Sequence, residues 1–373
     1  MSRQVILSVE ALDPVLTGVG RYVWELVQRI PRAPSIGRVR FLRNGEWIAD
    51  PAKLLVDPSP IERARWHRIL RKKTKPQRQW MERQLARASV CHGPNFFLPD
   101  IAETGIITVH DLSVFRFPET HPAERREEFD QRFEDSLRRA AHVITVSETA
   151  RKDVIDFTGI DPARVSAVYQ GVGAAFRPRM AEELLPVLSR MGLIPGGYGL
   201  CVSTIEPRKR VAELVRAWRM LPAGLRVLRP LVLAGSSGWL SDSIFEEIAQ
   251  GEREGWLRYI RYVEEGDLPF LYAGAALFVY PSIYEGFGLP PVEAMASGVP
   301  TVVSDASCLP EVTAGAALLA KPEDVEGFSG LLQKALLDES WRAAARDQGL
   351  EVAGRYSWDR CVRETAALYA KVR

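Results

Sequence analysis

Residues 284–298 read YEGFGLPPVEAMASG, and they follow an apolar run, Leu277–Tyr280, that is typical of a buried strand. Gly286 and Gly288 let the backbone turn sharply and approach a ligand closely. The two prolines that come next suit the first turn of a helix, and the final glycine is well placed to end it. The stretch therefore predicts a strand, a tight loop and a helix, the unit from which an α/β fold is built.

Two carboxylates and a set of backbone N–H groups make this loop a candidate ligand site. Glu285 lies at the predicted strand end, and Glu293 lies in the first turn of the predicted helix. The free N–H groups at a helix start can donate hydrogen bonds to an anion such as phosphate. Carboxylates accept hydrogen bonds from the hydroxyls of a sugar or ribose. The loop residues expected to contact such a ligand are Gly286, Phe287, Gly288 and Leu289. Alternatively, Glu293 only complements the helix dipole, a contribution of about 0.3–1 kcal/mol.

Short apolar runs alternate with longer amphipathic stretches along the chain, a pattern typical of parallel sheets flanked by helices. The expected strands are residues 4–9, 39–42, 90–92, 106–110, 143–146, 165–168, 200–203, 231–234, 260–263, 277–280 and 301–304. The expected helices are residues 21–30, 122–141, 211–221, 267–275, 291–297, 325–337 and 341–355. We therefore predict an α/β protein of two doubly wound, Rossmann-like domains.

A glycine-rich stretch that ends in proline, residues 170–178, is the expected linker between them. The predicted domains are residues 1–175 and 176–356, facing a central cleft, and the chain of 373 residues is long enough for both. In open α/β sheets ligands bind at the carboxyl ends of the strands, so the cleft is the expected site. Residues 357–373 are predicted to form a capped helix that packs back on the first domain.

Basic side chains follow the first predicted strand of the second domain. Arg208 and Lys209 come just before a predicted helix, where a guanidinium fork and a compact ammonium charge would neutralise a diphosphate. A solvated basic face is the alternative.

Two further strand ends, both in the first domain, carry candidate residues. Gly18 and Gly20 lie between strand and helix, where backbone N–H groups can approach an anion, although a flexible turn would also explain them. His110 and Asp111 end the strand 106–110. A histidine at such a place is either a ligand contact or a satisfied core group.

Together, these segments resemble the family-4 glycosyltransferases, whose fold is the two-domain GT-B type. The matching strings are E-x7-E at 285–293, E-P-R-K at 206–209, T-G-V-G-R-Y at 17–22 and H-D-L at 110–112. The resemblance implies that Glu285 contacts the donor sugar, that Glu293 contacts the ribose, and that Arg208 and Lys209 hold the leaving diphosphate. It also implies that the loop with Gly18 and Gly20 faces the donor phosphates and the acceptor, and that His110 contacts the transferred sugar while Asp111 orients its ring.

The resemblance implies a retaining hexosyltransferase that uses a nucleotide sugar, nearest to bacterial mannosyltransferases of O-antigen synthesis. GDP-mannose or a related GDP-deoxyhexose is the expected donor, and a saccharide or lipid-linked sugar is the expected acceptor. UDP- and dTDP-sugars stay open, as do a phosphorylase, a sugar-nucleotide epimerase and a non-catalytic nucleotide-sugar-binding partner. No D-x-D triplet occurs in the chain, so we expect a site without a metal or other cofactor.

The amino-acid composition indicates where in the cell the protein lies and which classes of partner it binds. A net charge of +2 argues against a nucleic-acid binder, and four scattered cysteines fit a reducing cytoplasm. Residues 61–87, however, hold ten Lys or Arg against two Glu, interleaved with apolar side chains. Trp66, Lys72 and Lys73 in this segment would suit a peripheral contact with an anionic membrane at its inner face. A solvated helical hairpin that packs on its own domain is the alternative.

Overall fold

The computed structural model describes residues 2–56 and 76–372, and these form two compact units. Unit 1 comprises Met1–Leu112, Glu127–Gln170 and Trp358–Arg373, and unit 2 comprises Ser113–Arg126 and Gly171–Ser357. The predicted first domain, residues 1–175, includes the segment 113–126, which the structure assigns to unit 2. The chain therefore passes into unit 2 twice and returns to unit 1 each time.

Unit 1 holds a seven-stranded sheet in the order β3-β2-β1-β4-β5-β6-β7. Its strands are β1 (Arg3–Ser8), β2 (Ile36–Arg43), β3 (Glu46–Ile48), β4 (Val90–Gly93), β5 (Gly105–Val109), β6 (Ala140–Thr145) and β7 (Val165–Ala167). All pairs are parallel except β2 with β3. Asn44 and Gly45 join that pair with φ of 50° and 73°, the two positive values that a tight hairpin turn requires.

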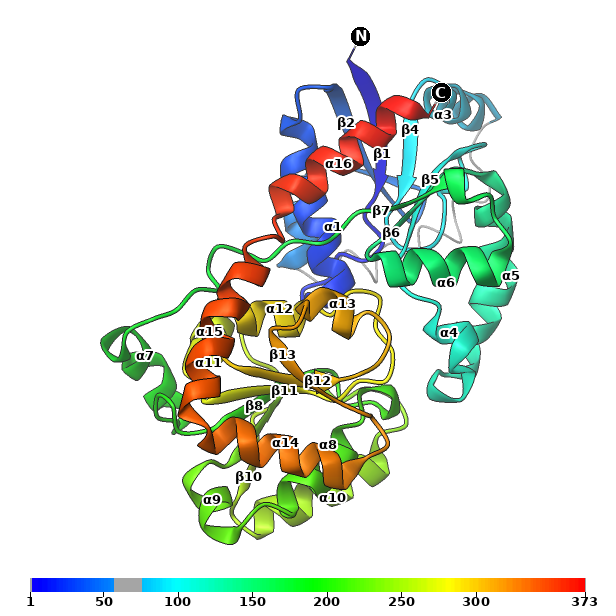
Figure 1. The fold of residues 1–373 in the computed structure, drawn as a ribbon. Helices are drawn as coiled ribbons and strands as arrows, with labels where there is room; N and C mark the ends of the chain where they lie inside the picture. Colours follow the sequence, from blue (N-terminus) through cyan, green and yellow to red (C-terminus); the bar gives the residue numbers. More distant parts are fainter. Residues whose placement is uncertain (1, 57–75, 373) are drawn as a thin grey trace. The chain divides into compact units, whose positions relative to one another are not determined.

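Helices cover the sheet of unit 1 (Figure 1). They are α1 (Gly18–Arg29), α3 (Pro76–Arg87), α5 (Ala123–Arg139, from residue 127 on), α6 (Glu148–Thr158) and α16 (Trp358–Lys371). The C-terminal helix α16 packs in unit 1 through Trp358 and Tyr369, which are 3% and 0% exposed. Arg29 of α1 and Asp359 of α16 form an ion pair of 2.7 Å at the surface. Helix α16, although last in the chain, is therefore an integral part of the first fold.

Unit 2 holds a six-stranded parallel sheet in the order β10-β9-β8-β11-β12-β13. Its strands are β8 (Gly199–Val202), β9 (Leu231–Ala234), β10 (Leu257–Tyr259), β11 (Leu277–Tyr280), β12 (Thr301–Ser304) and β13 (Ala317–Ala320). Its helices are α4 (Ser113–Arg116), α7 (Ala181–Leu188), α8 (Val211–Arg219), α9 (Ala223–Leu228), α10 (Asp242–Arg253), α11 (Leu268–Ala273), α12 (Leu289–Ala296), α13 (Leu309–Thr313), α14 (Val325–Leu337) and α15 (Glu339–Ala353). Two parallel-sheet, Rossmann-like folds in one chain confirm the predicted fold class.

The predicted strand at residues 260–263 is wrong. The strand that pairs with β9 is β10, three residues earlier, where the side chain of Leu257 is buried. Arg261 has a φ of 59°, which a strand residue does not adopt, so the predicted segment forms a loop, although the Ile260 N–H still donates to the carbonyl of Leu233 at 2.9 Å.

Alternation along the strands of unit 2 builds two core layers, one on each face of its sheet. Leu231 and Leu233 of β9 pack with Leu214 of α8 and Phe328 of α14. Between them, Val232 points to the opposite face, toward the layer that includes residues of α11 and α12. Figure 1 shows these helix sets on the two sides of the sheet. Because both faces are covered, the loops at the carboxyl ends of the strands are where polar side chains can gather.

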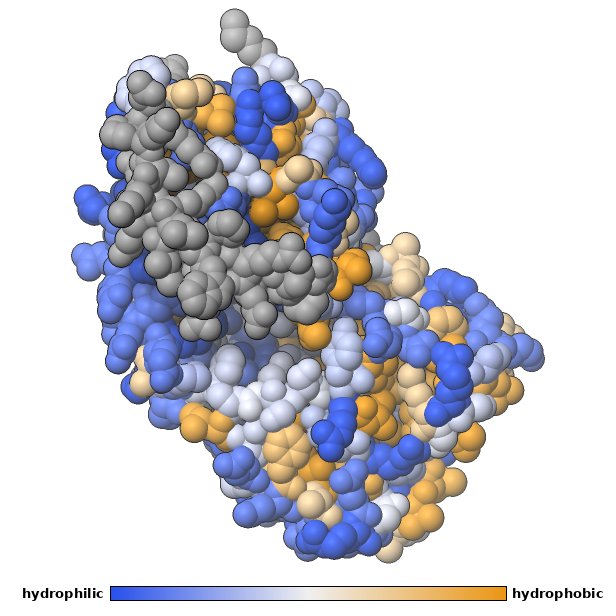
Figure 2. All heavy atoms as spheres, turned by 180° about the vertical axis from the view of Figure 1, so that it is seen from behind, coloured by the Kyte–Doolittle hydropathy of each residue, from blue (hydrophilic) through white to orange (hydrophobic). Residues whose placement is uncertain are grey.

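The described surface carries apolar side chains in small separate groups, as the face in Figure 2 shows. Within residues 2–56 and 76–372, no helix combines the length and apolar character that a membrane crossing needs. Trp66, Lys72 and Lys73 lie outside the described residues. On the described part of α3, Trp80 and Met81 are 64% and 65% exposed.

Candidate functional site

The loop that follows β8 presents two buried cations. A short 3-10 turn, Pro207–Lys209, follows the extended residue Glu206 and carries Arg208 and Lys209. Their side chains are only 10% and 11% exposed. Lysine and arginine are almost never this buried unless an anion compensates them.

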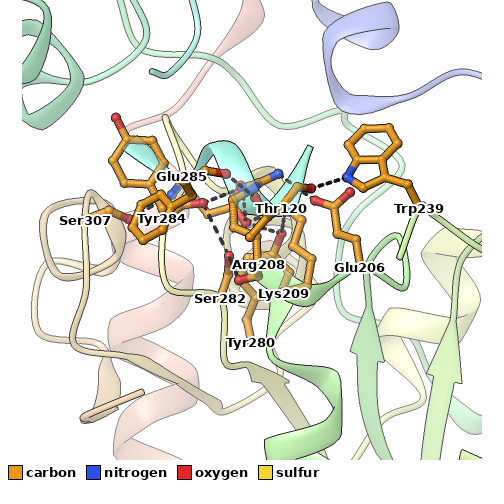
Figure 3. Close-up of polar contacts among 11 residues, drawn as sticks. Thr120, Glu206, Arg208, Lys209, Trp239, Tyr280, Ser282, Tyr284, Glu285 and Ser307 are labelled. Carbon is orange, nitrogen blue, oxygen red and sulfur yellow. Dashed lines mark hydrogen bonds and ion pairs between the residues drawn. The ribbon is translucent and has the colours of Figure 1, made fainter. Parts of the chain in front are cut away.

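The compensating anions come from the same turn and from the loop after β11. Glu285 Oε1 lies 2.5 Å from Lys209 Nζ and 3.6 Å from Arg208 Nη1. The other nitrogen of that guanidinium, Nη2, lies 2.7 Å from Glu206 Oε1. Two cations and two carboxylates therefore form one buried cluster, which we call the ionic cluster: Glu206, Arg208, Lys209 and Glu285 (Figure 3). Its formal charge balances to zero.

Neutral groups lock the cluster in place. The hydroxyl of Tyr280, the last residue of β11, donates to Glu285 Oε1 at 3.0 Å and accepts from Lys209 Nζ at 3.1 Å. Arg208 Nη1 donates to the carbonyl of Tyr284. Ser307, which follows β12, accepts the backbone N–H of Glu285 at 2.9 Å. Three neighbouring strands therefore fix the position of one carboxylate.

The backbone of the two loops is joined as well. Ile283 N–H donates to the carbonyl of Arg208 at 3.1 Å. Gly288, the residue before α12, has a φ of 86°, and a Cβ there would lie 2.9 Å from a side-chain carbon of Leu309. Glycine is therefore required by both conformation and space at the turn from loop to helix.

The charges decide the protonation of the cluster. Burial alone would raise the pKa of Glu285, but the positive charges of Lys209 and Arg208 and the hydrogen bond from Lys209 outweigh it. The pKa of Glu285 therefore lies below its ordinary value, and the group is a carboxylate at neutral pH. Burial also raises the pKa of Tyr280 well above its ordinary value, so its hydroxyl stays neutral and can donate.

The remaining residues of the predicted E-x7-E segment are mostly buried. Glu293 lies in the second turn of α12, not in the first as predicted, and is 4% exposed. Phe287 packs edge-on against Tyr356 with ring centroids 5.3 Å apart, and Leu289 is 7% exposed. Gly286 lies between the cluster and this helix. The buried side chains of Phe287, Leu289 and Glu293 therefore anchor the loop to the rest of unit 2.

The predicted residues of unit 1 form a different kind of arrangement. His110 is buried, and its Nε2 lies 2.9 Å from the carbonyl of Pro94. A carbonyl only accepts, so Nε2 carries a hydrogen and Nδ1 faces the side-chain nitrogen of Gln170 at 3.5 Å. The ring of Tyr22 meets His110 edge-on at 5.0 Å. Burial lowers the pKa of His110, so the ring is a fixed neutral group.

The surroundings of Asp111 and of the glycine loop are as follows. The ring nitrogens of His110 face Pro94 and Gln170, and the role of Asp111 in orienting the ring stays a prediction. The N–H of Gly20 donates to the Thr17 hydroxyl at 3.2 Å as part of the helix cap of α1. Gly18, the first residue of α1, is exposed.

The structure thus brings Arg208, Lys209 and Glu285 together in unit 2, while His110 has its own surroundings in unit 1. Sequence reasoning missed Tyr280, Ser307 and Gln170 as parts of these arrangements. Their position in the sequence could have indicated Tyr280 and Ser307, since each lies at or just after the carboxyl end of a parallel strand. Gln170 carried no such signal.

Two family models match the chain side by side. The model described as "Glycosyltransferase Family 4" matches residues 16–176, and that described as "Glycosyl transferases group 1" matches residues 197–352. The chain is 36% identical over 378 residues to O-antigen chain mannosyltransferase B of Escherichia coli, covering 98% of this chain and 99% of that protein. It is 27% identical over 228 residues to O-antigen chain mannosyltransferase RfbU of Salmonella typhimurium, covering 61% and 59%.

Solved structures share the fold at low identity. WaaG, a glycosyltransferase involved in lipopolysaccharide biosynthesis, matches with a TM-score of 0.74 at 14% identity, covering 99% of this chain and 100% of that one. Anabaena HepE in complex with UDP and glucose matches with a TM-score of 0.72 at 14% identity, covering 99% of both.

Proposed function

This chain belongs to the family-4, group-1 glycosyltransferases, and from that premise we propose that it transfers mannose from GDP-mannose to a saccharide or lipid-linked acceptor. The observation that carries the proposal is the ionic cluster: two buried cations held by carboxylates at the carboxyl ends of β8 and β11. Transfer breaks the bond between the anomeric carbon and the diphosphate, so negative charge develops on the departing group. Preorganised cations are most effective where such charge develops.

Each member of the cluster has a distinct part in this proposal. Arg208 and Lys209 bind the oxygens of the diphosphate. Glu285 keeps both cations in place, and its carboxylate accepts a hydrogen bond from a hydroxyl of the donor sugar. Tyr280, neutral and hydrogen-bonded to both Lys209 and Glu285, fixes the distance between them. The cations therefore need little reorganisation when the leaving group charges.

We propose retention at the anomeric carbon by front-face substitution. The bond from the anomeric carbon to the diphosphate oxygen breaks while the acceptor oxygen bonds on the same face. The proton of the acceptor hydroxyl passes to the departing diphosphate, so no side chain of the protein need form a bond to the sugar. Trapping a covalent sugar adduct on the enzyme would contradict this course.

The donor proposal draws on the relatives' names. The relative that is 36% identical over 98% of this chain is a mannosyltransferase, which favours mannose as the transferred sugar. The family likeness also includes a fold neighbour bound to UDP, so the base needs a direct test. A peripheral contact with an anionic membrane, through the segment 61–87, stays a prediction.

A nucleotide-sugar panel tests the proposal. GDP-mannose at a hundred times its dissociation constant should stabilise the wild type by about 2.7 kcal/mol, seen as a rise in Tm. We expect UDP-, dTDP- and ADP-sugars to give smaller shifts and EDTA to leave the GDP-mannose shift unchanged. In Arg208→Ala the shift should disappear.

Arg190→Ala is the matched control, since Arg190 of unit 2 is 61% exposed and pairs with Asp267 at 3.0 Å. It should keep the full shift. A shift with inorganic phosphate but with no nucleotide sugar would identify a phosphorylase instead. Conversion of a UDP-sugar without any acceptor would identify an epimerase.

A further inference from the structure

A segment of unit 2 that the proposed reaction does not use lies against the loop after β11 and against the loop that carries Trp239, which in turn contacts the loop after β8. Residues 113–126, which we call the strap, include α4, the 3-10 turn Pro118–Thr120 and the start of α5. Thr120 and His121 of the strap are 7% and 5% exposed. The strap is therefore a packed part of unit 2, although it follows strand β5 of unit 1 in the chain.

One end of the strap is held by Trp239. The indole N–H of Trp239 donates to the carbonyl of Thr120 (Figure 3). The Trp239 and His121 ring centroids lie 5.7 Å apart. The residue before this tryptophan, Gly238, donates its N–H to the carbonyl of Ile205 at 3.0 Å. A Cβ on Gly238 would lie 2.9 Å from that carbonyl oxygen. Trp239 thus sits on a loop that fits tightly over the residues leading into the ionic cluster.

The other contact of the strap reaches the loop after β11. The ring of Phe117 packs on the ring of Tyr284 with centroids 5.3 Å apart. Tyr284 immediately precedes Glu285, and its carbonyl accepts from Arg208 Nη1. The strap therefore packs against Tyr284, the residue whose carbonyl fixes one side of the Arg208 guanidinium.

We propose that the strap positions Arg208 for the β-phosphate of the donor, with Trp239 and Phe117 as its positioning residues. This inference rests on the proposed function, because it assumes that Arg208 binds a diphosphate. Glu206 and the carbonyl of Tyr284 hold the two ends of the guanidinium, and the strap contacts the Tyr284 side directly and the Glu206 side through the Trp239 loop. Loosening either contact lets these loops move apart, which affects a phosphate that Arg208 binds more than the rest of the nucleotide.

The test compares the dissociation constants of GDP and GMP by calorimetry, with UDP and UMP measured in parallel. The wild type should bind the diphosphate more tightly than the monophosphate. Trp239→Phe keeps an aromatic ring but removes the hydrogen bond to Thr120, and it should lower the GMP-to-GDP ratio of dissociation constants about fivefold, the effect of one lost hydrogen bond. Phe117→Leu should lower the GMP-to-GDP ratio of dissociation constants as well. Phe117→Tyr, which keeps the ring, should leave that ratio at the wild-type value.

Trp256→Phe is the matched control. Trp256 is buried in unit 2, and its indole N–H donates to Glu254 at 2.7 Å, away from the strap. It should lose comparable stability while the ratio stays at the wild-type value. An equal ratio in Trp239→Phe and Trp256→Phe would overturn the role of the strap while leaving the proposed function intact. Absence of any diphosphate binding by the wild type would instead overturn the proposed function, and the role of the strap with it.

Discussion

Among the described residues of unit 1 the buried polar side chains are neutral, whereas a cluster of buried charged side chains lies beside β8 and β11 in unit 2. In unit 1, His92 lies between two hydroxyls, with Tyr369 at 2.7 Å and Thr108 at 2.9 Å, and Thr108 continues to Tyr22 at 3.1 Å. All four side chains are fully buried. We call these residues the neutral chain. It satisfies its own hydrogen bonds inside one unit.

The ionic cluster is the more costly arrangement. Removing two ion pairs from water costs several kcal/mol per ion, and apolar residues in their place are often as stable. A neutral, satisfied chain carries no such penalty and serves mainly to fix one packing. The difference indicates that unit 2 keeps its buried charges for ligand binding, while unit 1 uses buried polarity to hold α1, α16 and the sheet in register.

The largest expected effect is that of unbalancing the ionic cluster. Lys209→Met removes the nearer cation from Glu285 and leaves Arg208, 3.6 Å away, as the other cation of the ionic cluster. We expect sugar transfer to slow by about 100-fold or more, the usual cost of losing one preorganised charge partner of the leaving group. Stability should fall by about 3–5 kcal/mol, because the change leaves a buried carboxylate poorly compensated. Nucleotide release from GDP-mannose with cell-extracted acceptor and urea unfolding measure the two effects.

Lys152→Met is the control for this variant. Lys152 pairs with Asp156 at 2.6 Å, but the lysine is 79% exposed. An exposed pair of this kind contributes little to stability, so stability and transfer should hardly change. If both lysine variants behaved alike, the contrast between buried and exposed charge would not hold.

A smaller effect on stability is expected when low pH favours protonation of His92 in the neutral chain. Burial lowers the pKa of His92 to about 3, with a further contribution from the nearby His110. The unfolded chain, with an ordinary histidine pKa near 6.5, takes up the proton first, so stability falls as the pH drops below that value. Between pH 6.5 and 5.0 this one residue should cost about 2 kcal/mol. Urea unfolding across that range measures the slope.

His92→Gln isolates this contribution. Glutamine can still bond to Tyr369 and Thr108 but does not titrate, so the variant should lose the His92 share of the acid slope. At pH 7.5 it should be about 1 kcal/mol less stable than the wild type, the difference should close at about pH 5.8, and by pH 5 the variant should be about 1 kcal/mol more stable than the wild type. An unchanged slope in the variant would mean that other groups cause the acid sensitivity.

The fold was predictable where strands are covered on both faces. Residues 231–234, 277–280 and 301–304 are continuous apolar runs, and the predicted bounds agree with β9, β11 and β12. Prediction failed at three of the four sheet edges: β10 was misplaced, and β3 and β13 were not predicted, whereas the edge strand β7 was predicted at residues 165–168. An edge strand pairs on one side only, so fewer of its residues must be apolar and its signal is weak.

The site was predictable only as far as strand ends could indicate it. Glu285, Arg208 and Lys209 follow parallel strands, and the rule that such ends converge puts them together. The strap was not predictable, because local sequence does not show that residues 113–126 pack on the second unit. Gln170 and Tyr22 were hidden for the same reason, since their contacts with His110 depend on tertiary packing alone.

The smallest expected effect separates the two ways in which Tyr22 contributes. Tyr22→Phe removes the hydroxyl that bonds to Thr108 but keeps the ring against His110. Stability should fall by about 1 kcal/mol, and sugar transfer should stay within about twofold of the wild type, because a single neutral hydrogen bond is lost. Tyr22→Leu also removes the ring and should slow transfer further, because His110 then loses the edge contact that helps to fix it. Equal loss of transfer in both variants would show that the hydroxyl matters more than the ring, and that the neutral chain takes part in the reaction.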